Sequence, residues 1–441
     1  MTNSSVLTIF GATGDLVRKK ILPSLYSLYK SKELPENLKV VGYARRDFTG
    51  DKYNKFIDES LNKYLNIGTV DAKFYDLFEY VQGDLEEEAG YKKLEEVIKK
   101  YDTMCGENCI KLFYFSIQPS FYETVASKIA EFEFNNNGYR LLIEKPYGHD
   151  EQSAKNLDSR IKQYFSEDQI YRIDHYLHKK IVREIPEFRF GHSIIKSSWQ
   201  PSEIKKIVIS TKEDFGVEDR GAFYDALGTL RDVGQNHLLA IASLIIMDEY
   251  DLNKPEDFLE KRTEALKNIK ILEEDEEIKN NTFRAQYEGY LNIENVEKDS
   301  KTETYFKARL FSSKEGWQEI PFILDAGKKL DEHKNVVKVY FETNVIFFEM
   351  YPNLEICIGK YDENSEQCLM KMDTEMSEHQ YVEEYASVIK ESIEGKRDYF
   401  VCIDEVLHQW KIVDAIVKAW HNNVVPLETY KPGTTPESNI N

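Results

Sequence analysis

Two patterns of hydrophobic and polar residues take turns along the first 145 positions: short apolar runs and longer stretches with a helical repeat. Stretches with a helical repeat separate short apolar runs of strand length, which lie at 6–10, 40–43, 112–115 and 139–143. Continuous apolar runs of this length are typical of strands buried on both faces, and helices between them indicate parallel pairing. The pattern therefore predicts an α/β fold with a doubly wound parallel sheet.

The second half of the chain has a different pattern. Apolar and polar residues alternate, or run in strand-length blocks, at 204–210, 304–310, 336–341, 345–350 and 354–358. Tyr351-Pro352-Asn353 separates the last two blocks and predicts a hairpin between them. Such blocks indicate a mainly antiparallel sheet with one face exposed or paired with a partner.

Helical repeats accompany these blocks at 225–247, 376–394 and 404–420. A chain of 441 residues exceeds one ordinary core, so two domains are expected. We predict a Rossmann-like domain over 1–174 and a larger α+β domain with a mainly antiparallel sheet over 175–441. The tail after Pro426 is rich in Pro, Thr and Ser and is predicted to be irregular.

Composition narrows the class of protein. Lys and Arg number 58 against 78 Asp and Glu, and this net charge of −20 disfavours nucleic acid as a partner. No apolar stretch is long enough to cross a bilayer, and the N-terminus lacks the basic and apolar segments of a signal peptide. We expect a cytoplasmic protein that does not contact membranes. The five scattered cysteines, with Cys105 and Cys109 as the only close pair, predict reduced thiols and no metal site.

A glycine turn, Gly11-Ala12-Thr13-Gly14-Asp15-Leu16, follows the first apolar run and opens a helical stretch. Glycine lets the backbone approach a pyrophosphate, and a helix N-terminus offers free N–H groups, although such a turn also occurs without a ligand. The second apolar run ends in Arg45-Arg46, where an NAD site commonly has an acid. Two guanidinium groups suit a 2′-phosphate and favour NADP over NAD, with a plain pair of surface arginines as the alternative.

Residues 172–179, RIDHYLHK, combine a carboxylate, two imidazoles, a phenol and cations. A sugar phosphate needs cationic and hydroxyl donors, and sugar oxidation needs a base oriented by a carboxylate. Glu144-Lys145-Pro146 ends the run at 139–143, where ligands of such sheets bind, and its Lys–Pro bond can be cis; an ordinary strand-ending turn is the alternative. His237 lies in an apolar helical stretch, where histidine is more often a core residue than a base.

Six motifs together resemble a known family. They are GATGDLVRKK at 11–20, EKPYG at 144–148, RIDHYLHK at 172–179, RFG at 189–191, GAFYD at 221–225 and QNH at 235–237. Their order and spacing resemble the glucose-6-phosphate dehydrogenase family over nearly the whole chain. The resemblance implies oxidation of β-D-glucose 6-phosphate at C1 to 6-phosphoglucono-1,5-lactone with hydride transfer to NADP, the first step of the oxidative pentose phosphate pathway. It also implies a homodimer or homotetramer assembled through the antiparallel sheet.

The same resemblance implies roles for single residues. His237 would take the proton from the C1 hydroxyl, and Asp174 would hold its imidazole in the useful tautomer. Lys145 would contact both the sugar and the cofactor. The remaining substrate ligands would be His175, Tyr176 and Lys179 at the phosphate, and Glu144, Glu213, Asp232 and Lys328 nearer the sugar. A local basic patch of Arg172, Lys179 and Lys180 would attract an anionic substrate to an acidic protein.

The chain departs from the family pattern at three positions. His178 replaces a usual glycine, and we expect its imidazole to point away from the phosphate. Asp325 and His333 stand where the family usually has cationic residues, which predicts weaker substrate binding with the same reaction type.

Two other functions stay open from the sequence. One is an NAD(P)-dependent dehydrogenase of another aldose or aldose phosphate, although a sugar without phosphate has no use for the cluster at 172–179. The other is a non-catalytic regulatory homologue, against which the retained Asp174 and His237 argue.

Overall fold

The computed structural model describes residues 4–48, 51–105, 109–132, 138–254, 256–362, 365–373 and 380–440. The chain divides into two compact units. Unit 1 contains Met1–Gly148, Gln152–His178 and Ser377–Ile403, and unit 2 contains His149–Glu151, Lys179–Met376 and Asp404–Asn441. The change of unit after His178 lies close to the boundary predicted at residue 174. Residues 377–403, by contrast, belong to the same unit as the N-terminal strands.

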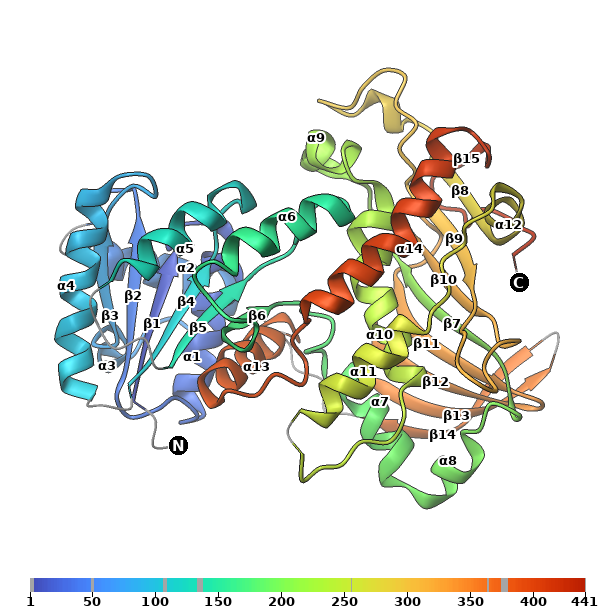
Figure 1. The fold of residues 1–441 in the computed structure, drawn as a ribbon, viewed down its shortest axis with the longest axis horizontal. Coiled ribbons are helices and arrows are strands. Elements are labelled where there is room, and N and C mark those ends of the chain that lie inside the picture. Colours follow the sequence, from blue (N-terminus) through green and yellow to red (C-terminus); the bar gives the residue numbers. More distant parts are fainter. Residues whose placement is uncertain are drawn as a thin grey trace. The chain divides into compact units, whose positions relative to one another are not determined.

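Unit 1 is built on the predicted parallel sheet (Figure 1). Its strand order is β3-β2-β1-β4-β5-β6, and every neighbouring pair is parallel. The strands are β1 (Ser5–Phe10), β2 (Leu38–Ala44), β3 (Phe78–Gln82), β4 (Ile110–Phe115), β5 (Tyr139–Ile143) and β6 (Ile170–Arg172). The order reverses between β1 and β4, so the carboxyl ends of the strands border the crevice where ligands of such sheets bind.

Helices cover both faces of this sheet. Leu7 and Ile9 of β1 lie in the apolar core of α1, α2 and α13, whereas the Phe10 ring lies 6.3 Å from Tyr91 of α4. This burial on both faces explains the unbroken apolar run in β1. The helices of this part are η1 (Val17–Ile21), α1 (Leu22–Lys30), α2 (Lys52–Leu65), α3 (Ala72–Tyr75), α4 (Glu88–Cys105), η2 (Pro119–Phe121), α5 (Tyr122–Ala130), α6 (Glu151–Ile161), η3 (Glu167–Gln169) and α13 (Gln380–Glu394).

Unit 2 is built on a nine-stranded, mainly antiparallel sheet in the order β14-β13-β12-β11-β7-β10-β9-β8-β15. The pairs β10–β7 and β15–β8 are parallel. The predicted hairpin at Tyr351–Asn353 joins β12 to β13. The strands are β7 (Ile204–Lys212), β8 (Thr282–Tyr287), β9 (Tyr305–Leu310), β10 (Phe322–Gly327), β11 (Lys334–Phe341), β12 (Asn344–Tyr351), β13 (Glu355–Asp362), β14 (Ser365–Asp373) and β15 (Leu427–Tyr430).

The prediction of an irregular tail after Pro426 is wrong for residues 427–430, whereas residues 431–440 contain no helix or strand. Residues 427–430 form β15, which pairs with β8, and Tyr430 is buried with its hydroxyl 2.5 Å from the carbonyl oxygen of Lys328. A four-residue edge strand has too little alternation to be seen in the sequence, and it forms because β8 offers a free edge.

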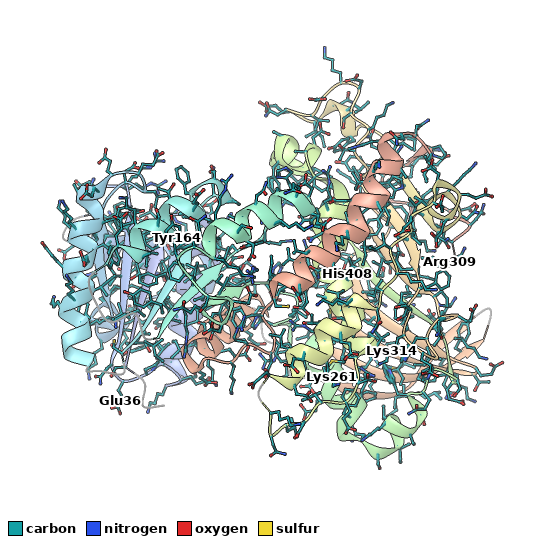
Figure 2. The ribbon with its side chains drawn as sticks, in the orientation of Figure 1. Glu36, Tyr164, Lys261, Arg309, Lys314 and His408 are labelled. Atoms are coloured by element: carbon teal, nitrogen blue, oxygen red, sulfur yellow. A yellow bond between two sulfur atoms is a disulfide. The ribbon has the colours of Figure 1, made fainter. Side chains whose placement is uncertain are left out.

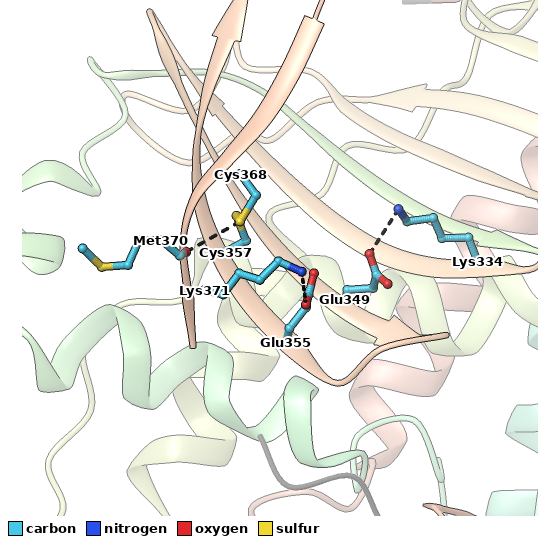
Figure 3. The surroundings of a disulfide bond; sticks show 7 residues. All are labelled: Lys334, Glu349, Glu355, Cys357, Cys368, Met370 and Lys371. Carbon is cyan, nitrogen blue, oxygen red and sulfur yellow. Dashed lines mark hydrogen bonds and ion pairs between the residues drawn. A yellow bond between two sulfur atoms is a disulfide. The ribbon is translucent and has the colours of Figure 1, made fainter. Parts of the chain in front are cut away.

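The prediction of reduced thiols is wrong for two cysteines. Cys357 of β13 and Cys368 of β14 form a disulfide, with their Cα atoms 5.9 Å apart (Figure 3). An ion pair of 2.8 Å between Lys371 and Glu355 joins the same two strands. The two cysteines looked scattered in the sequence because β14 was not expected there. Cys109 and Cys402 are free, and the side chain of Cys105 lies outside the described residues.

Helices of unit 2 carry or support some of the remaining predicted site residues. A buried ion pair joins Arg262 of α11 to Glu405 of α14, and His408, labelled in Figure 2, lies with Nε2 2.9 Å from the carbonyl oxygen of Ile269. Among the described residues, no helix is both long and apolar enough to cross a membrane. The helices are α7 (Lys180–Gly191), α8 (Ser193–Ser198), η4 (Glu218–Arg220), α9 (Gly221–Asp225), η5 (Leu230–Leu238), α10 (Leu239–Ile246), α11 (Asp257–Lys267), α12 (Asp275–Asn281), η6 (Tyr290–Asn292) and α14 (Ile403–His421).

Candidate active site

The glycine turn after β1 lies at the carboxyl edge of the parallel sheet. Gly11 has a φ of +79°, and a Cβ there would lie 2.1 Å from the carbonyl oxygen of Ser116, so this position requires glycine. The Gly14 N–H donates to the Gly11 carbonyl at 2.9 Å, which tightens the turn before helix begins at Asp15 and Leu16. The glycine turn follows β1 and Ser116 follows β4, so the turn lies between the two strands at which the strand order reverses. A diphosphate can approach the backbone closely at such a turn.

Arg46 reaches this turn from the end of β2. Its Nη1 lies 3.3 Å from the carbonyl oxygen of Thr13, and its side chain is exposed. The Arg45 side chain is 81% exposed, with Nε 3.9 Å from Asp84. Asp47, the acid beside both arginines, pairs with Lys52 at 2.9 Å. The Arg46 guanidinium therefore lies beside the glycine turn, and the guanidinium of Arg45, the preceding residue, is accessible.

Glu144 follows β5 and is held by tyrosines. The Tyr114 hydroxyl donates to its Oε1 at 2.5 Å, and Tyr385 of α13 also hydrogen-bonds the carboxylate. Desolvation raises the pKa of Glu144 to about 7, against the opposing effects of these hydrogen bonds and of the Lys145 charge. The carboxyl group therefore titrates near neutral pH. The Lys145–Pro146 bond is cis, as the sequence allowed.

The segment after β6 winds into a compact turn. The Asp174 carbonyl accepts from the Leu177 N–H at 3.1 Å, and its Oδ1 accepts from the Tyr176 N–H at 3.0 Å. The His175 ring lies 6.3 Å from the Tyr385 ring and nearly parallel to it. Unit 1 thus brings together Glu144, Asp174, His175 and Tyr176 at the carboxyl ends of β5 and β6.

Arg172 does not belong to an open basic patch, contrary to the prediction. Its side chain is only 3% exposed, and its guanidinium lies 2.7 Å from both Asp158 and Glu167. These carboxylates neutralise its charge inside unit 1, and α6 and η3 supply them. The sequence could not show this pairing, because only the fold brings the two acids to the end of β6.

In unit 2, η5 carries both His237 and Asp232. His237 is 2% exposed, and its backbone N–H donates to Asn236 Oδ1 at 2.7 Å. At the start of this helix, the Leu230 N–H donates to Glu303 Oε1 at 2.9 Å, and burial raises the pKa of Glu303. Both η5 and η1, which follows the glycine turn, are π-helical, and such segments occur frequently at functional sites.

Glu213 and Lys328 follow the neighbouring parallel strands β7 and β10. Their side chains form an ion pair; the Lys328 side chain is 3% exposed, and its ammonium lies 5.3 Å from the Tyr224 ring centre. Unit 2 therefore places two of the predicted substrate ligands in direct contact. Lys179, another predicted ligand, precedes α7 and is 8% exposed.

Comparison with known proteins decides the family. The sequence model described as glucose-6-phosphate dehydrogenase, NAD binding domain, matches residues 8–184, and the model of the C-terminal domain of the same enzyme matches residues 186–440. This chain belongs to the glucose-6-phosphate dehydrogenase family.

Individual glucose-6-phosphate dehydrogenases match over most of their length. The glucose-6-phosphate 1-dehydrogenase of Ceratitis capitata is 32% identical over 95% of this chain and 84% of its own. The Helicobacter pylori enzyme is 30% identical over 98% of this chain and 97% of its own. A solved glucose-6-phosphate dehydrogenase in complex with its substrate glucose-6-phosphate is 29% identical, with a TM-score of 0.87 over 100% of this chain and 96% of that one.

The departures of this glucose-6-phosphate dehydrogenase homologue have structural explanations. Asp325 is buried on β10 opposite Lys307 of β9, and burial raises its pKa while Lys212 and Lys307 lower it. His333 lies with Nδ1 3.6 Å from Asp214, and its ring centre is 4.0 Å from that of Tyr351. The Asp325 carboxylate thus has Lys212 and Lys307 as its partners.

Sequence reasoning missed two tyrosines of this glucose-6-phosphate dehydrogenase fold. Tyr114 and Tyr385 both hydrogen-bond Glu144, and Tyr385 also faces His175. Tyr114 lies within the apolar run of β4, where its hydroxyl needs a partner, and this was the only available signal. Tyr385 gave no signal, since it lies far along the chain on α13.

Proposed function

We propose that this chain is a glucose-6-phosphate 1-dehydrogenase that oxidises β-D-glucose 6-phosphate at C1 and transfers hydride to NADP. The observation that carries the proposal is the grouping of predicted site residues at the ends of β5 and β6 and on η5, within a family match that spans both units. A solved relative with this fold is named for its complex with glucose-6-phosphate.

In this proposal, His237 is the general base that accepts the proton of the C1 hydroxyl. Its imidazole takes the proton of the C1 hydroxyl while the C1 hydrogen leaves as hydride, so the C1–O bond becomes the carbonyl of 6-phosphoglucono-1,5-lactone. Bound NADP supplies the hydride acceptor. Asp174 holds the useful tautomer of His237 and stabilises the imidazolium. Because these two residues belong to different units, their pairing rests on the family resemblance.

The remaining residues bind the substrate in this proposal. His175, Tyr176 and Lys179 hold the phosphate, which needs cationic and hydroxyl donors. The sugar hydroxyls meet carboxylates that accept hydrogen bonds and amines that donate them. These sugar ligands are Glu144, Lys145, Glu213, Asp232 and Lys328.

NADP, rather than NAD, is the proposed cofactor. Arg46 lies beside the glycine turn and Arg45 is exposed next to it, so both guanidinium groups are available to a 2′-phosphate. The engagement of Asp47 by Lys52 supports this choice, because a free acid there would suit the ribose hydroxyls of NAD. Gly11, Thr13, Gly14, Asp15, Leu16 and Lys145 complete the proposed cofactor site.

Absorbance at 340 nm tests the whole proposal. We expect glucose 6-phosphate to drive reduction of NADP faster than of NAD, and His237→Ala to lower kcat by about three orders of magnitude. His192→Ala, which removes an exposed histidine of the same unit, is the matched control and should keep full activity. Folded protein that reduces neither cofactor would contradict the proposal.

The competing function, oxidation of another aldose or aldose phosphate, is decided in the same assay. Asp325 and His333 stand where the family usually has cationic residues, so the affinity for glucose 6-phosphate is expected to be weaker than is usual for the family. A higher kcat/KM with a different sugar phosphate would replace glucose 6-phosphate as the substrate. A preference for a sugar without phosphate would contradict the roles of His175, Tyr176 and Lys179.

We also propose that the protein self-associates through the nine-stranded sheet, as a homodimer or homotetramer. The edge strand β14 exposes Leu369 and Met370 by 57% and 59% of their surface. Exposed apolar side chains on an edge strand are costly in a monomer and favour pairing with another copy.

A further inference from the structure

His178 ends the turn that carries the proposed substrate ligands, at the position where the family usually has glycine. Its backbone N–H donates to the His175 carbonyl at 3.2 Å, so it closes the turn that starts at Asp174. Its side chain is completely buried. A buried imidazole is costly unless hydrogen-bonded, so its surroundings indicate what it does.

Two polar groups of α13 meet this imidazole. His178 Nδ1 lies 3.4 Å from Ser387 Oγ and 3.6 Å from Glu391 Oε2. Ser387 and Glu391 lie four positions apart, so they share one face of the helix. The Glu391 side chain is 8% exposed, which makes the contact a buried one. The Phe400 ring closes the site from the next segment, 5.0 Å from the imidazole.

The same C-terminal segment holds the strand before the turn. The Val401 N–H donates to the Arg172 carbonyl at 3.0 Å, and Arg397 donates to the Glu167 carbonyl at 2.8 Å. The Phe400 ring lies 4.9 Å from that of Tyr171. Residues 380–403 thus hold β6 through Arg397, Phe400 and Val401. They hold the end of the 174–178 turn through the contacts of His178.

We propose that His178 is a positioning residue that fastens the 174–178 turn to α13 through Ser387 and Glu391. The anchor fixes the backbone that presents Asp174, His175 and Tyr176. It also fixes the point from which the backbone continues to Lys179, the next residue. Glycine makes no such contact and leaves the backbone freer to move. The kinetic consequence rests on the proposed function, whereas the anchor itself is a property of unit 1.

Separate Michaelis constants for substrate and cofactor test the anchor. His178→Gly should raise the KM for glucose 6-phosphate about five- to tenfold and change the KM for NADP less than about twofold, because the glycine turn lies elsewhere in unit 1. His178→Gln should restore most of the affinity, since its amide can donate to Glu391. The effects of Glu391→Gln and His178→Gly should be non-additive when combined, as expected for groups in contact.

A loss of stability alone must give a different result. Val125→Ala removes buried apolar surface from α5, in the same unit, and is the matched control. It should lower the melting temperature without separating the two Michaelis constants. Equal increases of both constants in His178→Gly, or fully additive effects with Glu391→Gln, would overturn the proposal.

Hydrogen exchange tests the anchor without any turnover. In His178→Gly the amides of 174–178 should exchange at least about tenfold faster, while those of β1 keep their rates. Unchanged exchange at 174–178 would overturn the anchor. If the wild type fails to oxidise glucose 6-phosphate while this acceleration is observed, the proposed function fails and the anchor stands.

Discussion

At the scale of single residues, the buried carboxyl group of Glu144 makes the stability of unit 1 depend on pH. Its folded pKa of about 7 exceeds the ordinary value of 4.5, since burial disfavours the charged form. As pH rises from 4.5 to 7, the unfolded chain loses this proton and the folded chain keeps it. The free energy of unfolding therefore falls across this window, and the cost is complete above about pH 7.

Replacing Glu144 by glutamine should remove this cost. Glutamine cannot ionise and still accepts a hydrogen bond from Tyr114, so Glu144→Gln should stabilise unit 1 by about 1–3 kcal/mol above pH 7 and hardly at all below pH 4.5. Thermal unfolding across this pH range measures the difference. Glu59→Gln, at an exposed position on α2, is the control. A variant that is less stable than the wild type at pH 8 would contradict the burial argument.

At the scale of elements, α14 is fixed to α11 by a buried ion pair. Arg262 donates to Glu405 through Nε at 2.8 Å and Nη2 at 2.9 Å, and the two side chains are 0% and 3% exposed. Bidentate geometry of this kind offsets the cost of removing two charges from water. The Gln409 amide, on the same helix, lies 3.5 Å from the Asn236 carbonyl of η5, so α14 also supports the helix that carries His237.

Replacing one residue of this ion pair should lower the stability of unit 2 far more than replacing both residues. Glu405→Gln leaves a buried guanidinium without its counter-charge and should destabilise unit 2 by about 3–5 kcal/mol, whereas Arg262→Met with Glu405→Leu should stay close to the wild type. Calorimetric melting measures both. An equal loss of stability in the single and double variants would show that packing, rather than charge, holds the two helices together.

At the scale of the whole molecule, assembly and net charge act together. A charge of −20 favours solubility and opposes close approach of two copies, so self-association has to rest on apolar contact. The exposed Leu369 and Met370 on β14 offer such contact at the edge of the large sheet.

Sedimentation velocity should show a species of at least twice the 51.7 kDa chain mass. Leu369→Glu with Met370→Glu should shift this species to the monomer, because charge on a shared apolar edge repels the second copy. Tyr164→Glu, which alters an exposed aromatic residue of unit 1, is the control. A wild-type protein that sediments as a monomer at micromolar concentration would contradict self-association.

The order of the elements could be predicted where local pattern decides it. The unbroken apolar runs of β1, β2, β4 and β5 identified a parallel sheet, and the blocks of β11, β12 and β13 identified strands of the second sheet. Short or half-polar edge strands, such as β3, β6 and β15, were missed because their pairing depends on the neighbouring strand rather than on their own residues.

The amino-acid sequence by itself determined the fold class, the family, the glycine turn with its arginines, and the motif that contains Asp174 and His175. These features are local, since turn chemistry, periodicity and motif spacing are properties of neighbouring residues. Only the tertiary structure decided that Arg172 is neutralised by Asp158 and Glu167, that Cys357 is bonded to Cys368, and that α13 supplies partners to Glu144 and His178. Each of these depends on which distant side chains share a low-dielectric interior, where an unpaired charge is costly and a contact between remote segments forms only after the chain has folded.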